Sequence, residues 1–136
     1  MNPSSAADTG KLLLRLVLGL LILLHGISKM MHGVDHILGS VETAGLPHAF
    51  GYLVYVGEVV APVLLVIGFW TRLAAVVVAI NMVFAFYLVH ASQLFQLNAQ
   101  GGWQLELQGM YLFVAVAIAL LGAGRFSVGG ASGGFN

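Results

Sequence analysis

Four long apolar stretches occupy most of this chain, and they constrain its fold more than any other feature. They lie at residues 11–31, 51–70, 73–92 and 105–122. Each is close to the roughly 20 residues that an α-helix needs to cross ~30 Å of hydrocarbon. Because lipid offers no partner to an unpaired backbone group, such a segment crosses the bilayer as a helix. The sequence therefore predicts an all-α integral membrane protein built as a four-helix bundle.

The composition supports this interpretation and excludes several classes of protein. Of the 136 residues, 60% are hydrophobic and 7% are charged, whereas soluble domains carry about 25% charged residues. The formal net charge is zero, so no basic surface indicates a nucleic-acid partner. The chain contains no cysteine, which excludes disulfides, thiolate-bound zinc and iron–sulfur ligation by this chain. A redox role would therefore need a diffusible cofactor, a partner protein or histidine ligation.

The apolar stretches define one membrane domain, residues 11–128. The small polar residues 1–10 and the Gly/Ser-rich residues 129–136 are predicted to be mobile tails. Between the second and third stretches, Thr71 and Arg72 are predicted to form a very tight turn. The two longer connections are expected to lie on the opposite side of the membrane from this turn.

The first long connection, residues 32–50, contains glycine and proline among polar residues. Asp35 is expected to cap a short interfacial helix, and Gly45 and Pro47 are expected to end it. The apolar residues of this helix share one side; they are Ile37, Leu38 and Val41.

The basic residues predict the orientation of the bundle. Lys11, Arg15, Arg72 and Arg125 all fall at one face of a four-span bundle, and only Lys29 lies toward the other. The positive-inside rule then places both termini in the cytoplasm.

One side of the first stretch carries residues that recur at steps of four and three. They are Arg15, Gly19, Ile22, Gly26 and Lys29. This spacing places them on one helix face, where the glycines would let a neighbouring backbone approach closely. We expect Arg15 to extend to the head-group layer, whereas Lys29 either does the same at the other end or points into the bundle. His25 lies one turn before Lys29, so both can point into one space.

Glu58 is the strongest indication of function. It lies about seven residues into the second stretch, ~10 Å deep by helical rise. A lone carboxylate at that depth is costly and takes up a proton unless it is paired. Pro62 follows at i+4 and lacks the N–H group that would bond the carbonyl of Glu58. Glu58 is therefore a proton-accepting or ligand-binding group, or the partner of Lys29 in a structural ion pair, and both can hold together.

Other polar residues lie within or near the ends of the later stretches. We place His90 and Glu106, together with Tyr55 and Glu58, among the candidate cofactor-binding residues. The alternative for His90 and Glu106 is that both are hydrated interface residues. Asn81, near the centre of the third stretch, is expected to bridge helices by hydrogen bonds.

The five histidines raise the question of a haem or metal site. His25 and His90 could approach each other from two helices, as bis-histidine haem ligation requires. Their spacing matches no diagnostic pattern, and the Cys-x-x-Cys-His motif is absent from the sequence. We therefore predict no metal site and do not expect haem.

Several short motifs follow one another in an order and spacing that resemble a known family. They are Arg15…Gly19…His25-Gly26-x-x-Lys29, Gly45-Leu46-Pro47, Gly57-Glu58, Gly68-x-x-Thr71-Arg72-Leu73-Ala74-Ala75, His90, Gly102-Trp103-x-Leu105-Glu106-Leu107 and Gly122-Ala123-Gly124-Arg125-Phe126-Ser127. Over residues 12–128 the chain resembles the DoxX family of small bacterial membrane proteins. The resemblance implies a multi-pass, four-helix protein of the bacterial inner membrane. It also implies a link to quinone, because the family name is tied to the membrane subunit of a thiosulfate:quinone oxidoreductase.

Three functions are open at this point. The first is a quinone-linked redox subunit that acts with a soluble or membrane partner, with Glu58, Lys29 and His25 as its catalytic residues. The second is a non-catalytic membrane adaptor or assembly factor, in which the polar residues only lock the bundle. The third is a conduit for a small solute or for protons. Lipid is the expected surrounding in every case, and the glycines on the helix faces permit a homo-oligomer.

Overall fold

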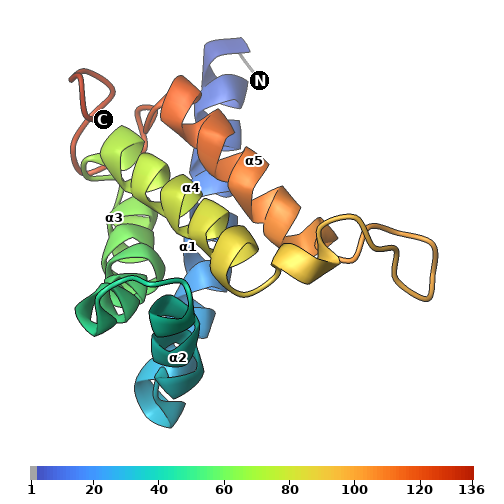
Figure 1. Ribbon diagram of the computed structural model, residues 1–136. Coiled ribbons are helices and arrows are strands. Elements are labelled where there is room, and N and C mark those ends of the chain that lie inside the picture. Colours follow the sequence, from blue (N-terminus) through green and yellow to red (C-terminus); the bar gives the residue numbers. More distant parts are fainter. Residues whose placement is uncertain (1–2) are drawn as a thin grey trace.

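The computed structural model describes residues 3–136. Over these residues the regular structure is helical, and no β-strand longer than a single bridge is present. The elements in chain order are α1 (Pro3–His32), α2 (Asp35–Thr43), the 3₁₀-helix η1 (His48–Leu53), the π-helix η2 (Val56–Val60), α3 (Ala61–Ile67), α4 (Thr71–Leu88), the 3₁₀-helix η3 (Ala91–Gln93) and α5 (Glu106–Leu121). Figure 1 shows α4 and α5 side by side, with α1 behind them and α3 beside α4.

Three helical segments among the described residues are long and apolar enough to cross a membrane. They are Ser4–His32, His48–Ile67 and Thr71–Leu88, so the first three predicted stretches are helices with the length and composition of candidate membrane spans. The apolar helix Glu106–Leu121 has 16 residues, which correspond to ~24 Å at 1.5 Å per residue. It is shorter than the predicted fourth span.

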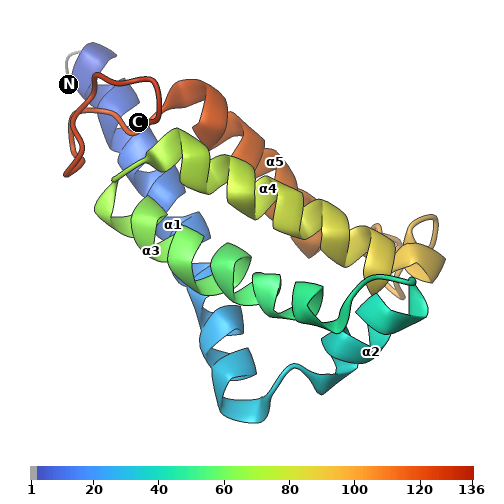
Figure 2. The same ribbon diagram turned by 60° about the vertical axis from the view of Figure 1, so that its left-hand side comes forward.

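The helices pack through a core of small and branched residues. Its buried members come from α1, α3, α4 and α5; they are Leu18, Ile22, Ala61, Leu65, Ala74, Ala75, Val78, Ala115 and Ile118. Alanines at these positions let the helix axes approach closely, as is typical of helix contacts in lipid. Figure 2 shows the start of α1 and the C-terminal segment at one end of the molecule and α2 at the other.

Two predicted tails are in fact structured. α1 begins at Pro3 rather than near residue 11, because residues 4–9 contain no helix breaker and continue the helix; residues 1 and 2 of this predicted tail lie outside the described residues. At the other terminus, Asn136 is buried and its Oδ1 accepts bonds from the N–H and the hydroxyl of Thr71, at 3.1 and 3.0 Å. The C-terminal segment therefore folds back onto the start of α4.

The predicted turn at Thr71 and Arg72 lies earlier in the chain. Gly68 ends α3 with φ +72°, Trp70 has φ +47°, and α4 begins at Thr71. A left-handed residue after a helix is typical of glycine, which has no Cβ to clash. Because Gly68 adopts this conformation without strain, α3 ends there and the turn comprises residues 68–70.

α2 confirms the predicted short helix in this connection, with its three expected apolar residues buried. They pack with Val34 into a second small core, separate from the main one. Asp35 is the first residue of the helix rather than its cap, since the cap position is Val34 and no side chain bonds the helix end. Gly45, with φ +76°, and Pro47 follow the helix as predicted.

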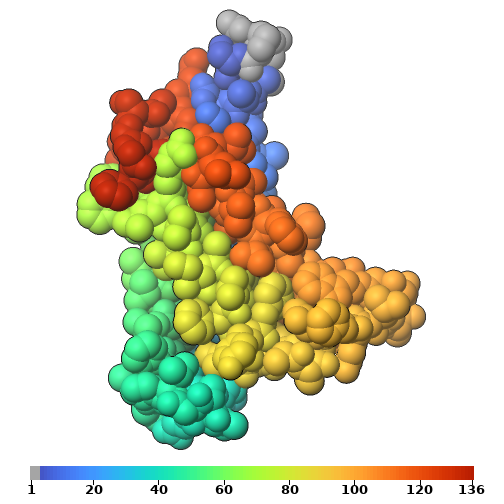
Figure 3. Space-filling model, turned by 45° about the horizontal axis from the view of Figure 1, so that its top comes forward, coloured from blue at the N-terminus to red at the C-terminus, as the bar shows by residue number. Residues whose placement is uncertain are grey.

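The connection between α4 and α5 projects away from the helices, as Figure 3 shows. An isolated bridge joins Leu97 to Trp103, and Asn98 Oδ1 accepts bonds from the N–H groups of residues 100 and 102. The Trp103 indole N–H donates to the carbonyl of Leu94 at 2.7 Å. These bonds give the loop a defined shape.

Candidate functional site

The backbone around Glu58 departs from the α-helix. Glu58 lies at the middle of the π-helix η2, in which the N–H of Ala61 bonds the carbonyl of Val56, five residues earlier. Pro62 explains the departure, because it has no N–H to bond back to Glu58 and its ring disfavours a regular α-turn. Single π-turns inside longer helices frequently mark functional sites.

Gly26 of α1 packs directly on this irregular turn. A Cβ placed on Gly26 would collide with the carbonyl oxygen of Glu58 and with the side chain of Val59. Only glycine therefore permits the two helices to meet here at this distance. This close approach places α1 where Lys29, one turn further on, reaches the Glu58 side chain.

Both oxygens of the Glu58 carboxylate have partners. Oε2 pairs with the Lys29 ammonium group, and Oε1 lies 3.4 Å from the amide nitrogen of Asn81 on α4. The Glu58 side chain is 7% exposed and that of Lys29 is 21% exposed, so the pair is reached from one side only. The ion pair with Lys29 that the sequence left as one alternative is present.

Neighbouring residues fix the two partners of Glu58. The Tyr55 hydroxyl donates to the backbone carbonyl of Lys29 at 3.3 Å, which ties η2 to the end of α1. Gly57 faces Asn81, and a Cβ at Gly57 would collide with the Asn81 side chain. α1, η2 and α4 are therefore held together by this group of residues.

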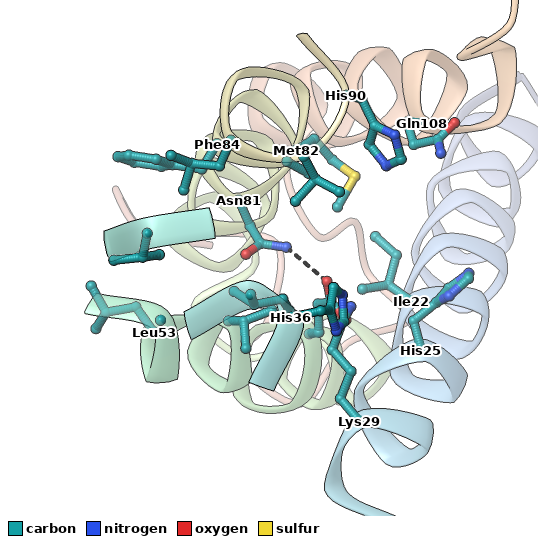
Figure 4. Close-up of a pocket in the computed structure, with 18 of the residues that line it drawn as sticks. Ile22, His25, Lys29, His36, Leu53, Asn81, Met82, Phe84, His90 and Gln108 are labelled. Atoms are coloured by element: carbon teal, nitrogen blue, oxygen red, sulfur yellow. Dashed lines mark hydrogen bonds and ion pairs between the residues drawn. The ribbon is translucent and has the colours of Figure 1, made fainter. Parts of the chain in front are cut away.

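A cavity of about 230 Å³ opens beside the Glu58 carboxylate, and Figure 4 shows the residues around it. Most of its wall is apolar and includes Ile22, Phe84 and Met82. Its polar and titratable lining residues come from five helical elements and from the residue before η3; they are His25, Lys29, His36, Glu58, Asn81, His90, Gln108 and Tyr111. A largely apolar pocket with a few convergent polar groups is typical of a binding site for a small molecule.

The polar groups are divided between two sides of the cavity. Figure 4 shows His90 together with Gln108, well separated from Lys29. The Nδ1 atom of His90 lies 2.9 Å from Oε1 of Gln93, so its other ring nitrogen remains available. His25 contacts the ring of Tyr111 edge-on, with 6.1 Å between ring centroids.

Not all of the predicted site residues meet at this cavity. Glu58, Lys29, His25 and His90 line it, whereas Tyr55 does not and acts only through the Lys29 backbone. Glu106 lies outside the cavity and is exposed. The structure does not bring Glu106 to this cavity, and its role in binding stays a prediction. Glu106 is the first residue of α5 and packs toward Gly102 of the projecting loop.

Three further lining residues, His36, Gln108 and Tyr111, were not predicted from the sequence. His36 could have been found, because it adjoins the apolar face of α2, which covers the cavity. Gln108 and Tyr111 carried no such signal, since α5 is apolar on nearly every side. Among residues 3–136, no group of three or more His, Asp and Glu side chains has the geometry to hold a metal ion.

Arg15 forms a second polar layer nearer the α1 N-terminus, and it corrects another expectation. It is 1% exposed rather than extended toward the head groups. Its guanidinium donates to the carbonyls of Leu65, Ala123 and Phe126 at 3.0, 2.5 and 3.1 Å, and more weakly to Val66 at 3.4 Å. These carbonyls lie at or beyond the C-terminal ends of α3 and α5, where helical donors run out and the helix dipole is negative.

Arg72 acts in the same way on α5. Its Nη1 donates to the carbonyls of Ala119 and Leu120 at 2.8 and 2.9 Å. The main apolar core lies between this layer of arginines and the Glu58 cavity. The cavity therefore belongs to one half of the molecule only.

Comparison with known proteins places the chain in a family. A family model described as DoxX matches residues 10–91. A Bacillus subtilis protein named "Putative oxidoreductase CatD" is 32% identical over 107 residues, which cover 77% of this chain and 78% of that protein. An uncharacterized protein of Haemophilus influenzae is 30% identical over 114 residues, which cover 82% of this chain and 81% of that protein. No solved structure gives a significant match. Because the family model covers more than half of the chain and two relatives align over most of their length, this chain belongs to the DoxX family of membrane proteins.

Proposed function

We propose that this protein is the quinone-binding membrane subunit of an oxidoreductase and works with a redox partner. The observation that carries the proposal is the position of Glu58, which is a paired carboxylate in the wall of an apolar cavity. The Bacillus subtilis relative bears the name "Putative oxidoreductase CatD", and this name supports the same class.

The lining residues fit the chemistry of a quinone headgroup. Conversion between quinone and quinol moves two electrons and two protons, and the electrons are exchanged with the redox centre of the partner. Lys29 and His25 donate hydrogen bonds toward one oxygen of the headgroup, and Glu58 passes a proton between that oxygen and water. At the opposite oxygen His90 would exchange the second proton with water and Gln108 would hydrogen-bond, while the apolar wall would exclude water from the ring itself.

The proposal includes a topology. The basic residues Lys11, Arg15, Arg72 and Arg125 lie toward the end of the molecule at which α3 and α5 finish. The positive-inside rule then places this end and both termini at the cytoplasmic face of a bacterial inner membrane. In this arrangement α5 completes a four-helix bundle, and the Glu58 cavity lies in the outer half of the bilayer.

One observation favours a second candidate, a non-catalytic adaptor. Both oxygens of Glu58 already have protein partners, Lys29 and Asn81, as a purely structural ion pair would require. The two candidates differ in whether the cavity holds a ligand. A conduit has less support, since the main core is apolar and lies between the cavity and the arginine layer.

The test is to measure quinone that stays with the purified protein. We expect wild-type protein extracted in mild detergent to retain quinone, detected by mass spectrometry of its lipid extract. Glu58→Gln should retain at least tenfold less, because the neutral amide cannot exchange the proton or keep the charge of Lys29 in place; a tenfold change corresponds to ~1.4 kcal/mol.

Glu42→Gln is the matched control, because Glu42 is exposed and bonds His48 away from the cavity. It should retain as much quinone as the wild type. Wild-type protein without quinone, or a Glu58→Gln variant that retains the wild-type amount, would exclude the quinone function and leave the adaptor.

A further inference from the structure

We infer that the ligand of this cavity carries a long hydrocarbon tail of the isoprenoid kind, and that its tail lies in a groove between α4 and α5. The inference rests on the proposed function and makes its ligand a membrane-resident quinone rather than a small soluble one. Three features of the molecule carry it: the size of the cavity, the apolar groove, and the residue that joins them.

The cavity is too small for a complete lipid. Its volume of about 230 Å³ lies below the ~300–1,000 Å³ of pockets that enclose drug-sized ligands. A substituted ring fills such a space, and an isoprenoid tail must then continue outside it. The polar lining also ends within the cavity, so the tail needs an apolar path.

A groove of about 400 Å³ runs between α4 and α5 and offers that path. All of its lining residues are apolar; on α4 they include Val76, Ile80 and Val83, and on α5 Leu112, Val116 and Leu120. Ile80, Val83 and Leu120 are 51%, 53% and 74% exposed, so the groove is open along its length. Figures 1 and 2 show that α4 and α5 stay side by side over this distance.

Phe84 joins the cavity to the groove. Its side chain is the one that lines both. It lies one turn after Ile80, which faces the groove, and three residues after Asn81, which faces Glu58, so its ring stands between the two. In Figure 4, Phe84 lies on the opposite side of the cavity from His25. A ring held beside Glu58 therefore has Phe84 at the side from which its tail would leave.

Because the cavity and the groove meet at Phe84, one ligand can occupy both, and this restricts what kind of molecule the ligand is. The acyl chain of a phospholipid would also suit an apolar groove, but a phosphate drawn to Lys29 would lie against the Glu58 carboxylate that already pairs with it, and the two anions would repel each other. A second copy of this chain could cover α4 and α5 without reaching Asn81. Only a molecule with a compact polar ring and a long apolar tail uses the cavity, Phe84 and the groove together.

The experiment compares two quinones that share one headgroup. The first has no tail, and the second has a long isoprenoid tail. Each is added to quinone-free purified protein, and the bound amount is measured by mass spectrometry after gel filtration. Wild-type protein should bind the long-tailed quinone at least tenfold more tightly than the tail-less one.

Val116→Trp fills the groove from a half-exposed position and should lower the affinity for the long-tailed quinone about tenfold, while the affinity for the tail-less quinone stays unchanged. Val63→Trp on α3 is the matched control, because Val63 and Val116 are both 41% exposed and Val63 lines neither the cavity nor the groove. Val83→Trp, from the facing helix, repeats the test should Val116→Trp fail to fold.

The outcomes separate the two proposals. Equal binding of both quinones, or groove variants that bind the long-tailed quinone as the wild type does, would overturn the tail groove and leave the headgroup site intact. Retention of phospholipid rather than quinone in the groove would overturn it as well. Failure of both quinones to bind, or binding that is insensitive to Glu58→Gln, would overturn the proposed function itself.

Discussion

The molecule contains two polar layers inside an apolar bundle, and they are built on different principles. In one, Arg15 is almost fully buried and bonds only backbone carbonyls. In the other, Lys29 pairs with the carboxylate of Glu58 beside a cavity. Both cations belong to α1, ~21 Å apart by helical rise. Their surroundings nevertheless differ, because Arg15 is enclosed by backbone carbonyls and Lys29 lines the cavity.

The difference shows that a buried charge alone does not identify a functional site. Arg15 has several acceptors and lines neither the cavity nor the groove between α4 and α5, so its charge serves to close the ends of α3 and α5. Glu58 has a titratable partner, a space for a ligand and an irregular backbone turn. The open space beside the charge, rather than the charge itself, distinguishes the candidate site.

We expect the largest loss of stability from a substitution in the Arg15 layer. Arg15→Met leaves the buried carbonyl of Ala123 without its donor and removes one of the two donors to Leu65, whose other donor is the N–H of Gly68. The variant should lower the free energy of unfolding by about 3–5 kcal/mol. Unfolding followed by circular dichroism in rising denaturing detergent measures this loss. Arg125→Met is the control, because Arg125 is exposed, and should differ little from the wild type.

Arg15→Lys tests whether charge alone, without the guanidinium group, stabilises the Arg15 layer. A lysine keeps the charge but cannot reach carbonyls on two helices at once, so it should restore only part of the lost stability. The fraction of this variant that folds should still retain quinone at the wild-type level. Loss of quinone from folded Arg15→Lys protein would show that the two layers are not independent.

The sequence predicted the Glu58 layer better than the Arg15 layer, for a physical reason. An ion pair joins two recognisable residue types, so Lys29 and Glu58 could be proposed as partners from their depth alone. The partners of Arg15 are backbone carbonyls of residues such as Leu65 and Ala123, which any residue type provides. Their availability depends on how the segment after α5 packs against the end of α3, and the residue types do not reveal that packing.

The same limit explains the other errors. α5 is apolar nearly all round, so its sequence could not fix which side faces the cavity, and Gln108 and Tyr111 were not expected there. The fold-back of the C-terminal segment depends on one buried side chain, Asn136, within a Gly/Ser-rich segment typical of a mobile tail. By contrast α2, with a clear apolar side, was predicted correctly.

A smaller effect is expected from a change at Gly26, whose close contact with Glu58 brings α1 to the cavity. Gly26→Ala places a methyl group against the carbonyl of Glu58, and overpacking of this kind costs about 1–3 kcal/mol. The shift of α1 should also lower quinone retention. Gly10→Ala, in the same helix with open space around it, should be neutral or stabilise by up to ~1 kcal/mol. If both variants behave alike, the contact between Gly26 and Glu58 does not hold the site.

The smallest effect decides whether the Lys29–Glu58 pair is only structural. Lys29→Met and Glu58→Gln should each destabilise, and a double-mutant cycle should give a coupling of about 1 kcal/mol, within the range seen for polar pairs in membrane proteins. The double variant removes both charges and should regain most of that loss. If the pair also serves a ligand, the double variant should be stable and yet retain no quinone. A double variant that regains both stability and quinone would mean that the Glu58 layer, like the Arg15 layer, only holds helices together.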